Sequence, residues 1–178
     1  MSKKLKSLGK LFDRRRKVFG VHVFGTSGVQ DYKFDHAANV LRDYLDSDGD
    51  GKADSKKLVK SLKREKAVLT VFSDEDQLEN FLSKHEQKFE KANANFQDLL
   101  DHEIVTAFDN SNEFDASLEE VFHLISDYGY SEIYPKQFGK KKDSVIGGLM
   151  NDARGGYFKK VPNNYPKEAY FTLSLIHI

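Results

Sequence analysis

The sequence predicts an α+β domain in which a small mixed sheet is covered by helices. Two short segments, Val18–Phe24 and Ala67–Phe72, are almost entirely apolar or aromatic, as strands buried on both faces are. Two segments with apolar residues at helical spacing, 32–45 and 55–64, lie between them. This connection is long enough to cross over a sheet, so the two strands are predicted to be parallel neighbours with the helix pair on one face.

Further helices are predicted in the second half of the chain. Ser73 with Asp76 resembles a capping box that opens a helix through Leu82. Residues 84–97 are polar, and we expect them to form a mobile connection. A helix is predicted over residues 115–127, ended by Gly129, and a shorter one over 144–153.

Residues 1–17 are predicted to form a basic N-terminal helix or tail outside the main domain. The segment contains a single acidic residue, Asp13. It contains eight basic residues: Lys3, Lys4, Lys6, Lys10, Arg14, Arg15, Arg16 and Lys17. We expect this segment to contribute little to the core, so that deleting residues 1–16 leaves the fold intact, and to make at most a weak contact with an anionic surface. Residues 18–171 are then one domain. Residues 172–178 are interpreted as a non-native tail, because LSLIHI is also what one reading frame of a common sequencing adapter encodes.

Composition excludes several classes of function. Basic and acidic residues number 28 each, so the net charge does not favour a nucleic-acid partner. There is no cysteine, which excludes disulfide scaffolds, thiolate nucleophiles and Cys-ligated zinc. No apolar run approaches the roughly 18–20 residues that a membrane-spanning helix needs, and the N-terminus lacks the features of a signal peptide. The expected location is cytoplasmic by default.

The segment Asp46–Asp54 has the pattern of an EF-hand-like calcium loop. Acidic residues stand at positions one, three, five and nine, namely Asp46, Asp48, Asp50 and Asp54. Gly51 at position six suits the sharp turn, and the carbonyl of Lys52 at position seven can add an oxygen. Closely spaced carboxylates repel one another by roughly 1 kcal/mol per pair in water, so a counterion is expected. The alternative is a solvated acidic turn between two helices.

The loop departs from the full EF-hand pattern at position twelve. Lys57 stands where a bidentate Glu would normally bind the ion, so affinity is expected to be low. Reduced loops of this kind resemble those of dockerin and thrombospondin type 3 repeats. That resemblance implies a structural ion in a calcium-rich, extracellular setting rather than a cytosolic sensor.

The helix predicted over residues 115–127 contains a second candidate site. Glu119, Glu120 and His123 form E-E-x-x-H, a one-residue variant of the zinc-peptidase pattern H-E-x-x-H. In this interpretation Glu119 and His123 bind zinc and Glu120 is the general base. The third ligand would come from Glu103, from Asp152 or from elsewhere. The alternative is an ordinary surface helix. In that case the apolar stripe facing the core is expected to consist of Leu118, Val121, Phe122 and Ile125, and the polar edge facing solvent of Glu119, His123 and Asp127.

Taken in order, these parts resemble an uncharacterised zincin-like group of proteins in which a D-x-D-x-D-G loop precedes an E-E-x-x-H helix. The stretches that carry the resemblance are residues 36–41, 44–54, 115–130, 134–135, 138–139 and 153–156. The resemblance implies a zincin-like arrangement. Together with the two candidate metal sites, it leads to the hypothesis of a calcium-stabilised, zinc-dependent hydrolase that acts on peptide or protein substrates. The alternative function is a non-enzymatic calcium-binding module for protein interaction.

Overall fold

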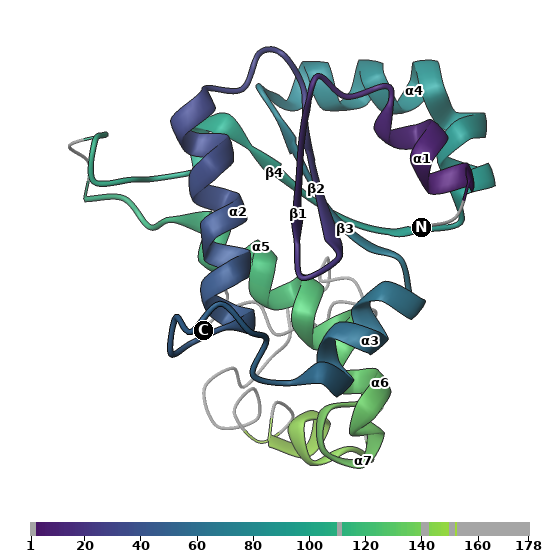
Figure 1. Cartoon of the computed structure of the whole chain (residues 1–178), viewed down its shortest axis with the longest axis vertical. Coiled ribbons are helices and arrows are strands. Elements are labelled where there is room, and N and C mark those ends of the chain that lie inside the picture. Colours follow the sequence, from purple (N-terminus) through teal and green to yellow (C-terminus); the bar gives the residue numbers. More distant parts are fainter. Residues whose placement is uncertain (1–2, 110–111, 140–142, 150–151, 153–178) are drawn as a thin grey trace.

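The computed structural model describes residues 3–109, 112–139, 143–149 and 152. It confirms the predicted α+β class (Figure 1). In the described part of the chain, the strands form one mixed sheet with the order β1-β2-β3-β4. They are β1 (Arg14–Val18), β2 (Val21–Gly25), β3 (Ala67–Phe72) and β4 (Asn95–Leu100). β1 pairs antiparallel to β2, whereas β2, β3 and β4 run parallel.

The two predicted strands are parallel neighbours, joined by the predicted helix pair. β2 leads into α2 (Asp31–Leu45), the acidic loop and α3 (Lys56–Arg64), and the chain then returns as β3. Ser55 caps α3 by accepting a hydrogen bond from the backbone N–H of Leu58. The crossover was predictable because each of its elements follows the periodicity of its own sequence.

The strand predicted over residues 18–24 begins three residues too early. Val18 is the last residue of β1, and Phe19 and Gly20 form a two-residue turn in which both have positive φ, 47° and 101°. Such turns match the twist of an antiparallel hairpin. The apolar run therefore contains the end of one strand, a turn and the next strand.

Helices cover both faces of the sheet, and each face has its own core. On one face α2, α3 and α5 (Ala116–Ile125) pack over a cluster that includes Val23, Leu69 and Leu99. On the other face α1 (Lys3–Gly9) and α4 (Glu75–Ala92) enclose an aromatic cluster with Phe24 and Phe72. Because adjacent residues of a strand point to opposite faces, Val23 and Phe24 belong to different cores.

The prediction of a basic helix or tail over residues 1–17 is wrong in its extent and its role. The helix ends at Gly9, and residues 14–18 form an edge strand of the sheet. Leu5, Leu8 and Phe12 are buried in the aromatic cluster. The basic side chains that dominate the sequence here stay at the surface, while the few apolar ones enter the core.

The polar segment 84–97 was also misread, because the structure gives it regular structure. α4 begins after Asp74, whose carboxylate caps Gln77, rather than at Ser73, and it continues to Ala92. Asn93 ends the helix with φ 46°. β4 then adds to the sheet beside β3. The strand contributes Leu99 to one core, while Phe96 and Leu100 pack against the other, and the polar residues between them weaken its apolar pattern.

From the end of α5 to Phe138 the chain is helical with short irregular breaks. η1 (Asp101–Glu103) precedes α5, and a π-helical turn η2 (Ser126–Tyr130), α6 (Ser131–Ile133) and α7 (Pro135–Phe138) follow it. Residues 145–149 are helical within the stretch predicted as the last helix. The expected tail 172–178 lies outside the described residues. Among the described helices, none combines the length and apolarity that crossing a bilayer requires.

Leu8→Ala tests whether the N-terminal helix belongs to the core. Leu8 is 0% exposed, and removing a buried leucine side chain typically costs about 2–5 kcal/mol. We expect a loss of that size in the free energy of unfolding, measured by urea denaturation. Lys6→Ala, at an exposed position of the same helix, is the control and should change stability by about 0.5 kcal/mol or less. Equal stability of the two variants would show that the helix is peripheral.

Candidate functional site

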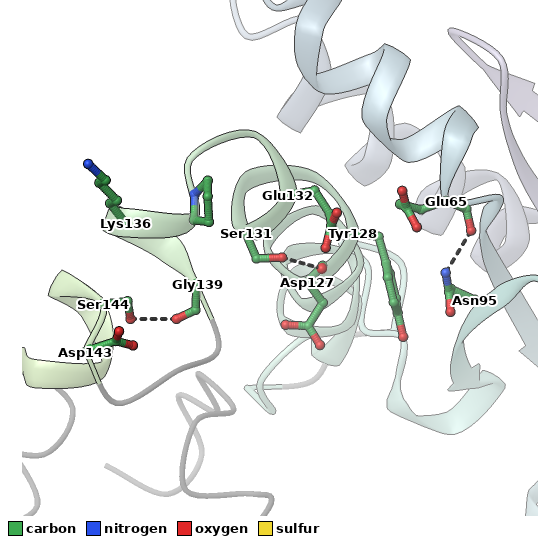
Figure 2. A pocket seen from close by; sticks show the side chains of 11 residues that line it. Glu65, Asn95, Asp127, Tyr128, Ser131, Glu132, Lys136, Gly139, Asp143 and Ser144 are labelled. Carbon is green, nitrogen blue, oxygen red and sulfur yellow. Dashed lines mark hydrogen bonds between the residues drawn. The ribbon is translucent and has the colours of Figure 1, made fainter.

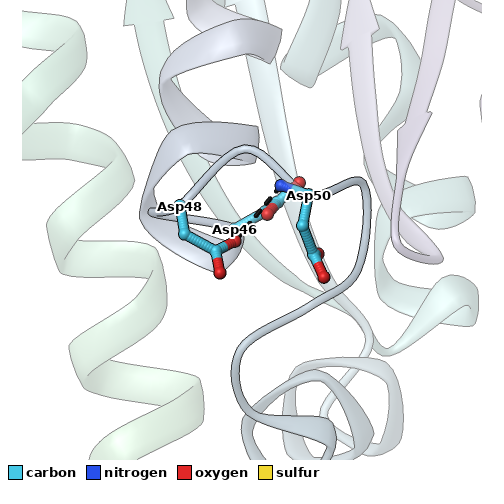
Figure 3. Close-up of side chains that lie close together, drawn as sticks. All are labelled: Asp46, Asp48 and Asp50. Carbon is cyan, nitrogen blue, oxygen red and sulfur yellow. Dashed lines mark hydrogen bonds between the residues drawn. The ribbon is translucent and has the colours of Figure 1, made fainter.

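Three carboxylates of the acidic loop come together at the end of α2 (Figure 3). Asp46, Asp48 and Asp50 each offer an oxygen, and these oxygens all lie within 4.8 Å of one another. Among the described residues, this is the one group of three or more acidic or imidazole side chains placed closely enough to hold a metal ion. The structure thus brings together three of the predicted calcium ligands.

Asp46 differs from its two partners because it is buried. The residue is 5% exposed, and its Oδ2 accepts a hydrogen bond of 3.0 Å from the backbone N–H of Gly51. Its Oδ1 is buried and has no hydrogen-bond partner. Leaving a buried charged oxygen without a partner is costly, and nearly all buried polar atoms in proteins avoid it. A bound cation would satisfy this oxygen.

The loop backbone holds the carboxylates in place. Asp48 Oδ1 accepts from the N–H of Asp50 at 3.2 Å, and Asp50 Oδ1 accepts from the N–H of Lys52 at 2.8 Å. Gly49 and Gly51 have φ values of 69° and 80°, which few residues other than glycine adopt readily. The turn is therefore formed by local bonds, and its acidic side chains converge.

The other predicted positions of the loop have different partners. Asp54 Oδ2 accepts from the backbone N–H of Ser47 at 3.0 Å and from its hydroxyl at 2.6 Å, and these bonds lower the pKa of Asp54. Asp54 is thus outside the three-carboxylate group. The side chain of Lys52, whose carbonyl is the predicted ligand, pairs with Asp50 Oδ2 at 2.9 Å. Lys57 at position twelve points away, with its Nζ 4.6 Å from the ring centre of Tyr134.

Glu119 and His123 of the E-E-x-x-H pattern lie inside the protein rather than on its surface, while Glu120 is half-buried. Glu119 is 3% and His123 is 6% exposed, and His123 Nε2 lies 3.3 Å from Glu119 Oε1. Leu118, predicted to face the core, is 42% exposed. The expected inside and outside edges of this helix are therefore wrong in part. α5 packs against β4, β3 and α2 together, so its buried arc is wider than one apolar stripe and includes polar residues.

Glu120 occupies an environment that favours its neutral form. The side chain of Gln97 on β4 donates a hydrogen bond to Glu120 Oε2. Burial first, and then the neighbouring charge of Glu119, raise the pKa of Glu120 from 4.5 to about 7. Carboxyl groups with such a pKa can exchange protons near neutral pH, and they are common in active sites.

A third zinc ligand is not supplied by the two predicted candidates. Glu103 Oε2 accepts a hydrogen bond of 2.9 Å from the backbone N–H of Leu100, and Asp152 is exposed. Within the described ranges, no further carboxylate or imidazole completes a three-ligand group with Glu119 and His123. His123 Nδ1 is nevertheless buried without a hydrogen-bond partner.

A cavity of about 750 Å³, which no sequence motif indicates, lies beside the turn that follows α5 (Figure 2). Its lining is rich in carboxylates and hydroxyls: Glu65, Asn95, Asp127, Tyr128, Ser131, Glu132, Pro135, Lys136, Gly139, Asp143 and Ser144. Two of these acids, Glu65 and Glu132, pair with Arg64. The cavity joins the end of α3 to α6 and α7, segments that no sequence motif connects.

Glu120→Gln tests the unusual pKa of Glu120. The folded protein holds this proton up to about pH 7, while the unfolded chain releases it near 4.5, so ionisation costs stability as pH rises through this interval. A glutamine at this position stays neutral at every pH, and its side-chain oxygen can still accept the hydrogen bond from Gln97. We expect the variant to gain stability relative to wild type at pH 8 but not at pH 4.5, measured by urea denaturation with a chelator present.

The matched control is Glu79→Gln at an exposed position of α4. It should change stability by a similar small amount at both pH values. A gain for Glu120→Gln that is also independent of pH would contradict the raised pKa of the half-buried Glu120.

Comparison of the chain with protein-family models, curated proteins and solved structures finds no match. Evidence for the function therefore comes from the geometry of the acidic loop and of the Glu119–His123 pair.

Proposed function

We propose that this chain is a calcium-binding protein and that the loop Asp46–Asp54 holds the ion. The observation that carries the proposal is the buried carboxylate of Asp46. Its Oδ1 has no hydrogen-bond partner, and one of its oxygens lies within 4.8 Å of oxygens of Asp48 and Asp50. Burial removes water as a partner for this oxygen, and the adjacent negative charges repel any anion. A cation is the partner that such a site accepts.

The ligand chemistry favours calcium over other divalent ions. All the converging donors are oxygens, which suits hard cations rather than zinc or copper. The donors sit on a backbone loop whose oxygens form an irregular set, which calcium accepts, whereas magnesium demands a small and nearly ideal octahedron. With Lys57 in place of the twelfth-position Glu, affinity should fall toward the roughly 10⁻⁴–10⁻³ M range of extracellular modules. This range suits a calcium-rich compartment.

The ion would act as a structural link between two helices. Asp46 directly follows α2, and the loop ends at Ser55, the N-cap of α3. A cation bound between them neutralises the repulsion that otherwise opposes this turn. In this proposal the protein is a binding module whose fold calcium stabilises.

Calcium should raise the melting temperature of chelator-treated protein. At about 10 mM calcium and the affinity given above, binding adds about 1.4–2.7 kcal/mol, which corresponds to roughly 3–10 °C for a chain of this size. Asp46→Asn should remove most of this shift. Asp43→Asn, at an exposed position of α2 outside the loop, is the control and should retain it. A wild-type melting curve that calcium leaves unchanged would rule out the proposal.

Lys57→Glu provides a gain-of-function test of the same loop. The substitution restores the acidic residue that normally binds the ion at position twelve. We expect calcium affinity, measured by titration calorimetry, to increase at least tenfold. Lys60→Glu places the same charge on an exposed position of α3 outside the loop and should change affinity much less. Similar gains in both variants would mean that general charge, rather than ligation at position twelve, governs binding.

A second candidate function is favoured by the buried pair of Glu119 and His123. In this proposal the chain is a zincin-like, zinc-dependent hydrolase acting on peptide bonds, with these two residues as ligands. One carboxylate oxygen and one imidazole are suitable zinc donors, and His123 Nδ1 lacks another partner. Glu120, with its pKa near 7, would accept a proton from the attacking water. Calcium would stabilise the enzyme.

This second proposal requires zinc itself to bind. His123→Ala and Glu119→Ala should each abolish zinc uptake measured by metal analysis, while Glu120→Gln should retain the metal and lose hydrolysis of a peptide substrate. Wild-type protein that takes up no zinc would leave the calcium-binding module as the function.

A further inference from the structure

The helix that enters the calcium loop contacts the first half of α5. The hydroxyl of Tyr44, in the last turn of α2, donates to the Leu118 carbonyl oxygen at 3.3 Å, and its ring lies 6.2 Å from that of Phe122. Earlier in α2, His36 Nε2 lies 2.7 Å from Asp115 Oδ2, the N-cap residue of α5. Contacts two turns apart on α2 therefore fix the beginning of α5.

The helix that leaves the loop contacts the segment after α5. The hydroxyl of Ser61 on α3 donates to the Tyr128 carbonyl oxygen at 3.1 Å, inside the π-helical turn η2. Arg64 Nη2 donates to Glu132 Oε2 on α6 at 3.2 Å. α3 thus holds the end of α5 through the turn that continues it.

Packing strengthens this second contact. A Cβ atom at Gly129 would lie only 2.4 Å from Leu58 Cδ1, so α3 rests directly on the backbone of η2. Lys57, at the loop position that normally supplies a ligand, instead donates from Nζ to the Ile133 carbonyl oxygen at 3.4 Å and lies over the Tyr134 ring. The residue that would ordinarily complete the ion site is used to bind the segment after α5.

We propose that calcium in the loop controls the position of α5, and with it the buried Glu119–His123 pair, by fixing α2 relative to α3. This inference rests on the calcium binding proposed above. The loop joins the two helices, and they hold opposite ends of α5. Without the ion, repulsion among Asp46, Asp48 and Asp50 opens the turn, and the resulting change in the helix angle must break contacts at one end of α5 or move it.

The coupling is reciprocal by thermodynamic necessity. If calcium stabilises the contacts of α2 and α3 with α5, then those contacts strengthen calcium binding by the same factor. Removing them weakens the affinity of a loop whose ligands are untouched. This consequence separates coupling from simple stabilisation of the loop.

The first test is hydrogen exchange of the full chain, with calcium alone as the probe. Calcium should slow exchange of backbone amides in residues 116–134 at least about 5-fold, the lower end of known couplings. The effect should be absent in Asp46→Asn, which disables the loop. Calcium that binds but protects only the loop residues would overturn the inference and leave the calcium site intact.

The second test removes one hydroxyl from each side, in the double variant Tyr44→Phe with Ser61→Ala. Neither change alters charge, and neither residue offers an oxygen to the three-carboxylate group. The dissociation constant for calcium, measured by calorimetry, should increase at least about 5-fold. Ser83→Ala removes an exposed hydroxyl from α4 and should leave it unchanged.

The outcomes distinguish the two proposals. If wild-type protein binds no calcium, the proposed function fails and the coupling with it. If wild-type binds and the double variant binds equally well, the coupling is wrong and the binding function stands. Should the double variant fail to unfold cooperatively, hydrogen exchange of the wild-type chain decides alone.

Discussion

The convergence of three carboxylates at the junction of α2 and α3 is the constraint that the helices on one face of the sheet share. Backbone N–H donors of the loop hold Asp46, Asp48 and Asp50 with oxygens within 4.8 Å of one another. Like charges at about 4 Å repel by roughly 1 kcal/mol in water and by about 4 kcal/mol at the effective dielectric near a protein surface. Because Asp46 is buried, water cannot screen its charge well. In the proposed function, a cation bound here would neutralise this repulsion and link α2 to α3.

The helices on that face of the sheet are arranged around this junction. α2 and α3 leave it in different directions and hold α5 near its two ends, through Tyr44 and Ser61. α5 in turn covers β3 and β4, and its buried arc brings Glu119 and His123 into the protein. The other face, closed by α1 and α4, is built from aromatic packing around Phe12 and contains neither candidate site.

Local sequence was sufficient where one physical signal dominates an element. The crossover from β2 to β3 was predictable because buried strands and amphipathic helices have distinct periods, and the loop because alternating Asp and Gly residues specify one turn. Prediction failed where tertiary contacts decide. Arg14–Val18 looks helical and basic, yet pairing with β2 makes it a strand. Glu119 and His123 look exposed in a helical projection, since no projection reveals that α5 is covered from two directions. The cavity beside η2 is lined by Glu65 just after α3 and by residues of β4, η2, α6 and α7, and only the assembled fold brings them together.

A crystal structure of the full chain grown with calcium tests the central claim most directly. The account predicts one ion in the loop, about 2.3–2.6 Å from oxygens of Asp46, Asp48 and Asp50 and from the carbonyl oxygen of Lys52. Asp46 Oδ1 should be among its ligands. Electron density without an ion at this position, with Asp46 Oδ1 bonded instead to an ordered water or a protein donor, would contradict it.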